Sequence, residues 1–337
     1  MTLPAVSQPL PRSLRRRACI ALAMLGLLPA GLPAMAQSAY PDKPVKLIVP
    51  YPPGGGVDIL ARNLSQALAE RTKQSFVVEN RAGANGIIGT EYVARAPADG
   101  YTLLLGNIGP NAINQALYPQ LPYDCVSDFS PVVLAARSNH VVAVNPKVPA
   151  NSIAELVALA RERPGQLSFA SSGQGGSPHL AGELFMLMTD TRMLHVPYRG
   201  AAPANTDLVA GQVDLTFTVL GPVLPYLRAG QLRALAVTGS EPSELLAGVP
   251  TVAQAGVPGY DVTTWFGIFA PAGTPGETVQ RINALFNEVL ADEAMRRKLN
   301  GLGYDIGGGT SGDFSGLVER EVEKWARVVK EAKVSVE

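Results

Sequence analysis

The sequence predicts an α/β fold made of two doubly wound lobes joined by two crossing strands. Short runs rich in Val and Ile, such as residues 45–50, alternate with segments in which Leu and Ala recur at helical spacing. A strand, a glycine-rich turn and a helix follow one another once in each half of the chain. Two extended stretches, residues 132–146 and 263–273, are each long enough to pass between lobes. At 337 residues the chain has room for two domains of about 150 residues.

Residues 1–36 have the pattern of a secretory signal peptide. The basic stretch RSLRRR precedes the uncharged stretch ACIALAMLGLLPAGLPAMA, which ends in a small-x-small motif. A retained membrane anchor is the alternative, because the uncharged stretch is nearly long enough to span a bilayer. Pro29, Pro33 and the small-x-small end favour cleavage after Ala36. We therefore expect an exported, periplasmic protein.

Charge and cysteine content argue against nucleic-acid and membrane partners and against an intrachain disulfide. The full chain has 28 basic and 28 acidic residues, and cleavage removes four arginines, which leaves 24 against 28 and a formal charge of −4. Nucleic acid and anionic membranes are therefore poor partners. Cleavage also removes Cys19, so no intrachain disulfide can form, and we interpret Cys125 as a small buried side chain rather than a reactive thiol.

The first half of the chain reads as alternating strands and helices. After the strand at 45–50, Leu60, Leu64 and Leu68 indicate a helix. Further elements are expected in the order strand 76–80, helix 86–96 and strand 101–106. This alternation predicts a parallel sheet whose ligands lie at the carboxyl ends of the strands.

The same pattern restarts after the first crossing stretch. Ser152 and Glu155 fit a capping box that begins a helix. LSFAS, HVPYRG, DLTFTV and LRALAVT give strand signals, and the segments between them read as turns and helices. Residues 241–261 show no clear periodicity. After the return strand, helices are expected at 274–292 and at about 313–333.

The glycine loop at Gly54 to Asp58 is the strongest candidate for a binding element. Glycines before a helix let the backbone approach a ligand, and the free amides of the first turn favour an anion. No Lys-Ser/Thr pair follows, as a P-loop requires, and Ile59 replaces the third glycine of a dinucleotide fingerprint. Residues Ser171 to His179 form a second glycine-rich turn before a predicted helix. A tight strand-to-helix connection without a ligand remains the alternative for both loops.

Individual side chains carry weaker signals. Asp58 either stabilises the first helical turn or faces a polar part of the ligand. Arg199 can pair with a ligand carboxylate or form a contact between segments at the surface. His179 can donate a hydrogen bond to a ligand or be merely exposed. Trp265 and Phe266 are read as packing residues, with lining of the cleft left open.

The sequence gives no sign of a metal site or of catalysis. The histidines do not have the spacing of metal ligands, so no metal and no cofactor are expected. The G-x-S-x-G motif is absent, and no sequence motif places a base beside Ser171, Ser172 or Ser177. We therefore expect a protein that is not an enzyme.

Six collinear stretches resemble the Bug (TctC-like) family of extracytoplasmic solute receptors of tripartite tricarboxylate transporters. They are YPDKPVKLIVPYPPGGGVDILAR, VENRAGANGIIGTEYVARAPADGYTLLLGN, SGQGGSPHLAGELF, HVPYRGAAPANTDLVAGQVD, LRALAVT and WFGIFAPAGTP. The resemblance implies a type II periplasmic binding-protein fold, with lobe 1 at 37–137 plus 263–337 and lobe 2 at 138–262. It also implies a small organic carboxylate bound between the lobes.

The resemblance further implies which residues bind the ligand. In the family, backbone amides and waters at the first glycine loop grip a carboxylate, and further contacts come from the third strand and the second lobe. The corresponding residues here are Pro53, Gly54, Gly55, Gly56, Val57, Asp58, Asn107, Ser171, Ser172, Ser177, His179, Tyr198 and Arg199. Val57 departs from the small hydroxylated residue common at its position, so it supplies the ligand with an amide but no side-chain hydrogen bond.

The function expected on these grounds is capture of a carboxylate and its delivery to membrane permease subunits of the tripartite tricarboxylate type. A receptor that must open and dock is most simply a monomer. Two alternatives stay open: a sensor that presents the carboxylate to a membrane kinase, and a secreted α/β hydrolase.

Overall fold

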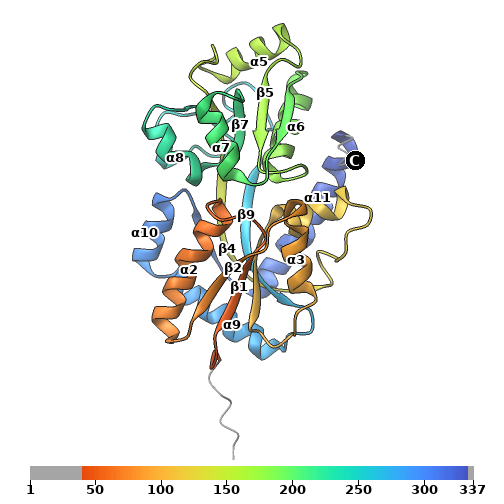
Figure 1. Cartoon of the computed structure of the whole chain (residues 1–337), viewed down its shortest axis with the longest axis vertical. Helices are drawn as coiled ribbons and strands as arrows, with labels where there is room; N and C mark the ends of the chain where they lie inside the picture. The colour runs from red at the N-terminus through yellow and green to blue at the C-terminus, as the bar shows by residue number, and fades with distance from the viewer. Residues whose placement is uncertain (1–39, 333–337) are drawn as a thin grey trace, which may run out of the picture. The chain divides into compact units, whose positions relative to one another are not determined.

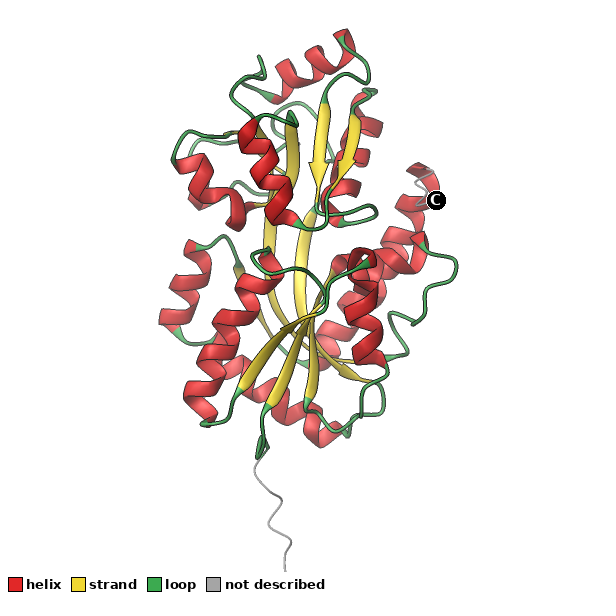
Figure 2. Ribbon diagram, in the orientation of Figure 1, coloured by secondary structure: helices red, strands yellow, loops and turns green. Residues whose placement is uncertain are grey.

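The computed structural model describes residues 40–332, and these form a mixed α/β architecture (Figures 1 and 2). The predicted signal peptide lies outside this range, as does the end of the last predicted helix. No helix within the range combines the length and apolarity needed to cross a bilayer. The strands are β1 (Val45–Val49), β2 (Phe76–Asn80), β3 (Thr102–Asn107), β4 (Phe129–Val144), β5 (Ser168–Ser171), β6 (Leu194–Pro197), β7 (Leu215–Val219), β8 (Arg233–Val237), β9 (Thr263–Pro271) and β10 (Asp305–Gly308).

The helices fall between the strands, as the alternating pattern predicts. They are α2 (Gly56–Thr72), α3 (Ile87–Ala94), α4 (Asn114–Leu117), α5 (Ile153–Glu162), α6 (Ser177–Thr189), α7 (Ala201–Ala210), α8 (Leu220–Arg228), α9 (Gly276–Leu290), α10 (Glu293–Gly301) and α11 (Ser311–Ala332). Short helical turns lie at Ala84–Gly86, Gly109–Ile113 and Glu244–Leu246. The predicted capping box is confirmed, because the Ser152 hydroxyl accepts the Glu155 amide at 3.1 Å.

The strand β4 belongs to both halves of the sheet. Its first part pairs with β9 and β10, and its last part, from His140 to Val144, pairs with β7 and β8. The strand order is therefore β2-β1-β3-β9-β4-β10 in one lobe and β8-β4-β7-β5-β6 in the other. The expectation that two long extended stretches form strands is confirmed, and Figure 1 shows β4 and β9 passing through the middle of the molecule.

The predicted parallel pairing is confirmed for the strands joined by helices, and the two crossing strands add antiparallel pairs. β1 pairs in parallel with β2 and β3, and β5 pairs in parallel with β6 and β7, as expected for strands joined by helices. β4 and β9 run antiparallel to each other, because one leaves a lobe and the other returns to it. Sequence reading missed α10 and β10, which are short and follow a long helix.

Helices cover both faces of each sheet, which gives three hydrophobic clusters. On β4, Val141 and Ala143 pack with α7 and α8, whereas Val142 and Val144 pack with α5 and α6. The alternation follows from the period of two along a strand. In the other lobe α2 and α9 cover one face, and α3 and α11 cover the other. Cys125 is fully buried, and its burial raises the pKa of the thiol to about 12, as expected for a packing residue.

Candidate functional site

A small cavity lies where the carboxyl ends of strands from both sheets meet. Its volume is about 50 Å³. It is lined by segments that follow β1, β3, β5, β6 and β7, together with one residue of β9. The lining residues are Tyr51, Pro52, Gly55, Gly56, Val57, Asn107, Ser172, Gly176, Ser177, Pro178, Gly200, Ala201, Thr218, Val219, Pro222 and Phe266. This is the edge at which ligands of α/β sheets are expected.

Four helices begin at the cavity, and no side chain caps any of them. The residues preceding α2, α6, α7 and α8 are Gly55, Gly176, Gly200 and Val219, and all four line the cavity. By contrast, the side chains of Ser152 and Asp292 cap α5 and α10, whose residues do not line the cavity. The first amides of the four uncapped helices have no partner within the helix, so they are available to an anion.

None of the residues lining the cavity carries a formal charge. Arg199, which the sequence placed among the candidates, is exposed, and no ion pair joins it to any residue between 40 and 332. The electrostatic attraction for an anion therefore comes from backbone amides and helix dipoles.

Asp58 stabilises the first glycine loop and does not line the cavity. Its carboxylate is 3% exposed and accepts hydrogen bonds from the Gly54 amide at 3.0 Å, from Asn80 Nδ2 at 2.9 Å and from two nitrogens of Arg62 at 2.9 Å. Burial acts to raise the pKa of this carboxyl, but the bonds from Arg62, Gly54 and Asn80 together lower it. Gly54 itself requires glycine, since its φ is +85°.

Asn107, at the end of β3, lines the cavity. Its Oδ1 accepts a hydrogen bond from the Tyr51 hydroxyl at 3.1 Å, which leaves the NH₂ group as the free donor. Burial raises the pKa of Tyr51, so the phenol stays protonated and keeps Asn107 in this orientation. Tyr51 was missed in the sequence, although it directly follows the β1 region.

The second glycine loop rests on two stacked imidazoles. His179 Nδ1 accepts the Gly175 amide at 3.0 Å, so Nε2 carries the proton and faces Glu183 Oε1 at 3.3 Å. His195 stacks on His179 with ring centroids 3.8 Å apart. Burial, followed by the proximity of His179, lowers the pKa of His195 to about 3. These rings support the loop from behind and do not line the cavity.

The structure places an imidazole beside each of two candidate serines, which no sequence motif indicated. His195 Nε2 lies 2.7 Å from Ser171 Oγ, and His140 Nε2 lies 3.2 Å from Ser177 Oγ. Ser171 does not line the cavity, and it is 1% exposed. Ser177 does line it, but burial lowers the pKa of His140 to about 4, and no carboxylate among the described residues is bonded to either imidazole. A weakly basic imidazole without an orienting carboxylate is a poor general base.

The remaining candidates divide between the cavity and its surroundings. Gly55, Gly56, Val57, Asn107, Ser172 and Ser177 line the cavity. Pro53, Gly54, Asp58, Ser171, His179, Tyr198 and Arg199 do not. Tyr198 is turned toward Asp207, to which its hydroxyl donates at 2.8 Å, while its own amide donates to the Ser171 carbonyl.

Several lining residues were not candidates from the sequence. Thr218, Val219 and Pro222 come from β7 and α8, and Gly200 and Ala201 begin α7. Gly200 carried the only local signal, because a glycine between YR and a helical segment is typical of a close approach. Phe266, whose role was left open, lines the cavity, whereas Trp265 is buried in the core.

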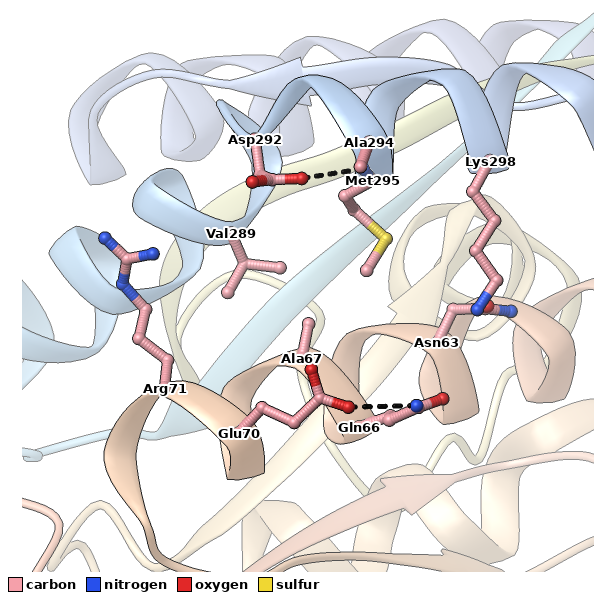
Figure 3. A pocket seen from close by; sticks show the side chains of 10 residues that line it. All are labelled: Asn63, Gln66, Ala67, Glu70, Arg71, Val289, Asp292, Ala294, Met295 and Lys298. Atoms are coloured by element: carbon pink, nitrogen blue, oxygen red, sulfur yellow. Dashed lines mark hydrogen bonds between the residues drawn. The ribbon is translucent and has the colours of Figure 1, made fainter.

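A larger groove of about 410 Å³ lies between α2 and the α9–α10 pair (Figure 3). Several of its polar side chains have partners: Gln66 donates to Glu70, and Asp292 caps α10 at the Met295 amide. Arg71 pairs with Glu288. Its walls are α2, the end of α9 and the first turns of α10; no glycine loop reaches it, and Asp292 already caps the start of α10.

Comparison with known proteins agrees with the resemblance seen in the sequence. Residues 60–334 match the model of the tripartite tricarboxylate transporter family receptor, TctC. The UPF0065 protein in the tcbD-tcbE intergenic region of a Pseudomonas species is 40% identical over 95% of both chains. Protein BugT of Bordetella pertussis is 37% identical over 92% of this chain and 96% of its own.

Solved structures match over nearly their whole length. A protein of R. palustris, solved with adipate, is 40% identical, with a TM-score of 0.86 over 88% of this chain and 99% of that chain. MatC of Rhodopseudomonas palustris, solved with bound malate, is 31% identical, with a TM-score of 0.82 over 86% of this chain and all of that chain, 100%. The fold is therefore the two-lobed type II periplasmic binding-protein fold, and the chain belongs to the Bug (TctC-like) family of tripartite tricarboxylate transporter receptors.

Proposed function

We propose that this protein is a solute-binding receptor that captures a small organic carboxylate in the cavity between its lobes. The observation that carries the proposal is the convergence of four uncapped helix N-termini on a cavity without charged side chains. Backbone amides bind a carboxylate without a competing ion pair, and the dipoles of all four helices favour negative charge at the same point. Asn107 Nδ2 adds a side-chain donor.

The proposed ligand is a dicarboxylate or a related small acid. Relatives solved with adipate and with malate support this class. A cavity of about 50 Å³ has room for only a few waters, so a longer acid requires the lobes to separate and close again around it. We propose the lobes to be 37–137 plus 263–337 and 138–262, with β4 and β9 as the hinges.

The proposed ligand contacts come from both lobes. Gly55, Gly56, Val57 and Asn107 contribute from one, and Ser172 and Ser177 from the other. We assign Pro53, Gly54, Asp58, Ser171, His179 and Tyr198 to shaping the two loops, and Arg199 to the exposed surface next to them.

The proposed partner is a permease of the tripartite tricarboxylate type, to which the monomeric receptor delivers its ligand from the periplasm. The family name supports this partner, and the predicted signal peptide supports the compartment. The family and the relatives solved with adipate and malate support a receptor rather than an enzyme.

Native mass spectrometry of the freshly purified mature protein tests the proposal, followed by thermal shifts against dicarboxylates, tricarboxylates, aromatic acids and acidic amino acids. We expect a carboxylate to be carried through purification or to raise the melting temperature, because a ligand that binds only the folded state stabilises it. No bound species and no shift with any acid would contradict the proposal.

A further inference from the structure

The segment Gly83–Gly86, within the VENRAGANG stretch, has an unusual backbone that the binding site does not explain. Ala84 has a φ of +45° and Asn85 a φ of +50°, in the left-handed region that L-residues seldom adopt. The other non-glycine residues with positive φ between 40 and 332 are Lys73 and Asp190, which end helices. A pair of such residues outside a helix end points to a local requirement for this conformation.

The side chain of Asn85 is held firmly in place. Its Nδ2 donates to Asn114 Oδ1 at 3.0 Å, and Asn114 Nδ2 donates back to the Asn85 carbonyl at 3.3 Å. Asn114 is fully buried at the start of α4. The Asn85 Oδ1 atom is therefore fixed in position, yet it is buried and has no hydrogen-bond partner.

Asn85 Oδ1 faces the second glycine loop across the seam between the lobes. A Cβ atom placed on Gly176 would lie 3.2 Å from Asn85 Oδ1, and one on Gly173 would lie 3.8 Å from it. Gly176 has φ −71° and ψ 162°, a conformation open to any residue, so its backbone does not demand glycine. A Cβ on Gly176 would also lie 3.3 Å from the Gly173 carbonyl oxygen, but that contact lies within one loop, and only the contact with Asn85 joins the two lobes.

We propose that Asn85 is a positioning residue that sets ligand affinity from outside the cavity, by making the closing contact with Gly176. The proposal rests on the proposed receptor function. When the lobes separate, water reaches Oδ1; when they close, Oδ1 is buried without a partner, so closure carries a cost that bound ligand must offset. Glycine at position 176 keeps the contact possible, because a methyl group there meets a fixed oxygen atom.

A double-mutant cycle with Gly176→Ala and Asn85→Gly tests the proposal. Asn85→Gly keeps the positive φ accessible and removes the opposing side chain. Calorimetric titration with the carboxylate of highest affinity should show that Gly176→Ala weakens binding by about tenfold or more in the native background and by less than about twofold in the Asn85→Gly background. Equal weakening in both backgrounds, or none in either, would overturn the proposal.

Small-angle X-ray scattering of the four proteins provides a readout that needs no ligand affinity. We expect Asn85→Gly to decrease the radius of gyration of the ligand-free protein, because it removes the oxygen whose burial opposes closure, and Gly176→Ala to leave the radius at the wild-type value. Equal radii for all four proteins would refute the closing contact. If the wild type bound no carboxylate, the receptor proposal would fail in the titration, and the scattering comparison would still decide the role of Asn85.

Discussion

The two glycine loops both lead a strand into an uncapped helix, but different groups hold them in shape. At the first loop, the buried carboxylate of Asp58 accepts hydrogen bonds from the Gly54 amide, Asn80 and Arg62. At the second, imidazole rings hold the loop: His179 accepts a hydrogen bond from the Gly175 amide, and His195 lies 2.7 Å from Ser171 Oγ. One loop rests on an ion pair and the other on two stacked rings.

The difference shows that loop geometry, and not the charge of the supporting side chains, is what the two sites share. In both loops the charged or titratable groups lie behind the backbone, and only amides and small side chains reach the cavity. The two supports should nevertheless fail under different conditions. Substitutions in the glycine loops test the amides, and substitutions at Asp58 and at the histidines test the side chains that hold the loops.

The largest effect is expected from filling the first loop. Gly55 has φ −83° and ψ 170°, and a Cβ there would approach no protein atom more closely than 4.0 Å. Gly55→Val should therefore fold normally but occupy the cavity, with affinity reduced at least about 100-fold in calorimetric titration. The matched control is Gly276→Val at the start of α9, where nothing lies within 4 Å. Unchanged affinity for Gly55→Val would rule out the amide cradle.

Removing the Asp58 carboxylate should have the next largest effect, a loss of folding stability. Asp58→Ala leaves the Gly54 amide, Asn80 and the Arg62 guanidinium without their shared acceptor. We expect the free energy of unfolding to fall by about 3 kcal/mol in urea titration, since the carboxylate is buried. A loss near zero would show that the loop keeps its shape without Asp58.

The buried histidines should respond to mild acid, and His140, which lies beside Ser177, gives the clearest case. Burial holds the pKa of His140 at about 4, whereas the unfolded value is 6.5, so below pH 6.5 the unfolded state binds the additional proton. Lowering the pH from 6.5 to 5 should remove about 2 kcal/mol of stability through His140, at about 1.4 kcal/mol per pKa unit, and His195, whose pKa is also lowered, adds a further loss over the same range. Melting curves of His140→Gln should show a smaller decrease over this range.

Asp58 gives the control for this window. Its lowered pKa means that its contribution is present above the unfolded value of 3.8 and is lost as the pH falls through the folded pKa. Asp58→Asn should therefore leave the change between pH 6.5 and 5 as it is in the wild type. An equal slope for wild type and His140→Gln would contradict the assignment of the mild-acid transition to His140.

A smaller effect is expected from the hydroxyl that His140 orients. Ser177 lines the cavity at the start of α6, and Ser177→Ala removes one neutral donor or acceptor. Affinity should fall by about three- to tenfold, the value of one net hydrogen bond. Ser171→Ala, behind the loop, is the comparison variant and should change stability more than affinity.

The smallest effect is expected at the exposed arginine. Arg199 has no ion-pair partner among residues 40–332 and does not line the cavity. Arg199→Ala should change affinity by less than about twofold at moderate salt, because an exposed charge is screened. A fall of more than about tenfold would mean that the guanidinium pairs directly with the ligand.

Local signals in the sequence predicted the loops, and long-range packing decided the rest of the site. The strand before Gly54 and the helix after it follow from Val and Ile runs and from Leu spacing, so both glycine loops were found. Thr218, Val219 and Pro222 lie in an ordinary strand and helix, and they reach the cavity only because β7 ends beside β4. No local pattern marks such residues.

The orientation of side chains was equally beyond the sequence. The sequence left open whether Asp58 stabilises the first helical turn or faces the ligand. In the structure its carboxylate binds Arg62 and Asn80, which lies 22 residues away, and these bonds hold it away from the cavity. No sequence motif placed a base beside Ser171 or Ser177, yet sheet pairing and the crossing strand bring His195 and His140 beside them. Contacts of this kind depend on register, which short motifs do not encode.

Paired calorimetric titrations test the central claim most directly. The mature protein is titrated with the carboxylate that stabilises it most, and then with the corresponding primary amide. If helix amides hold a carboxylate without a charged side chain, the acid should bind at least about 100-fold more tightly than the amide, and Arg199→Ala should not alter that ratio. Equal affinity for acid and amide, or a ratio that collapses in Arg199→Ala, would contradict the account.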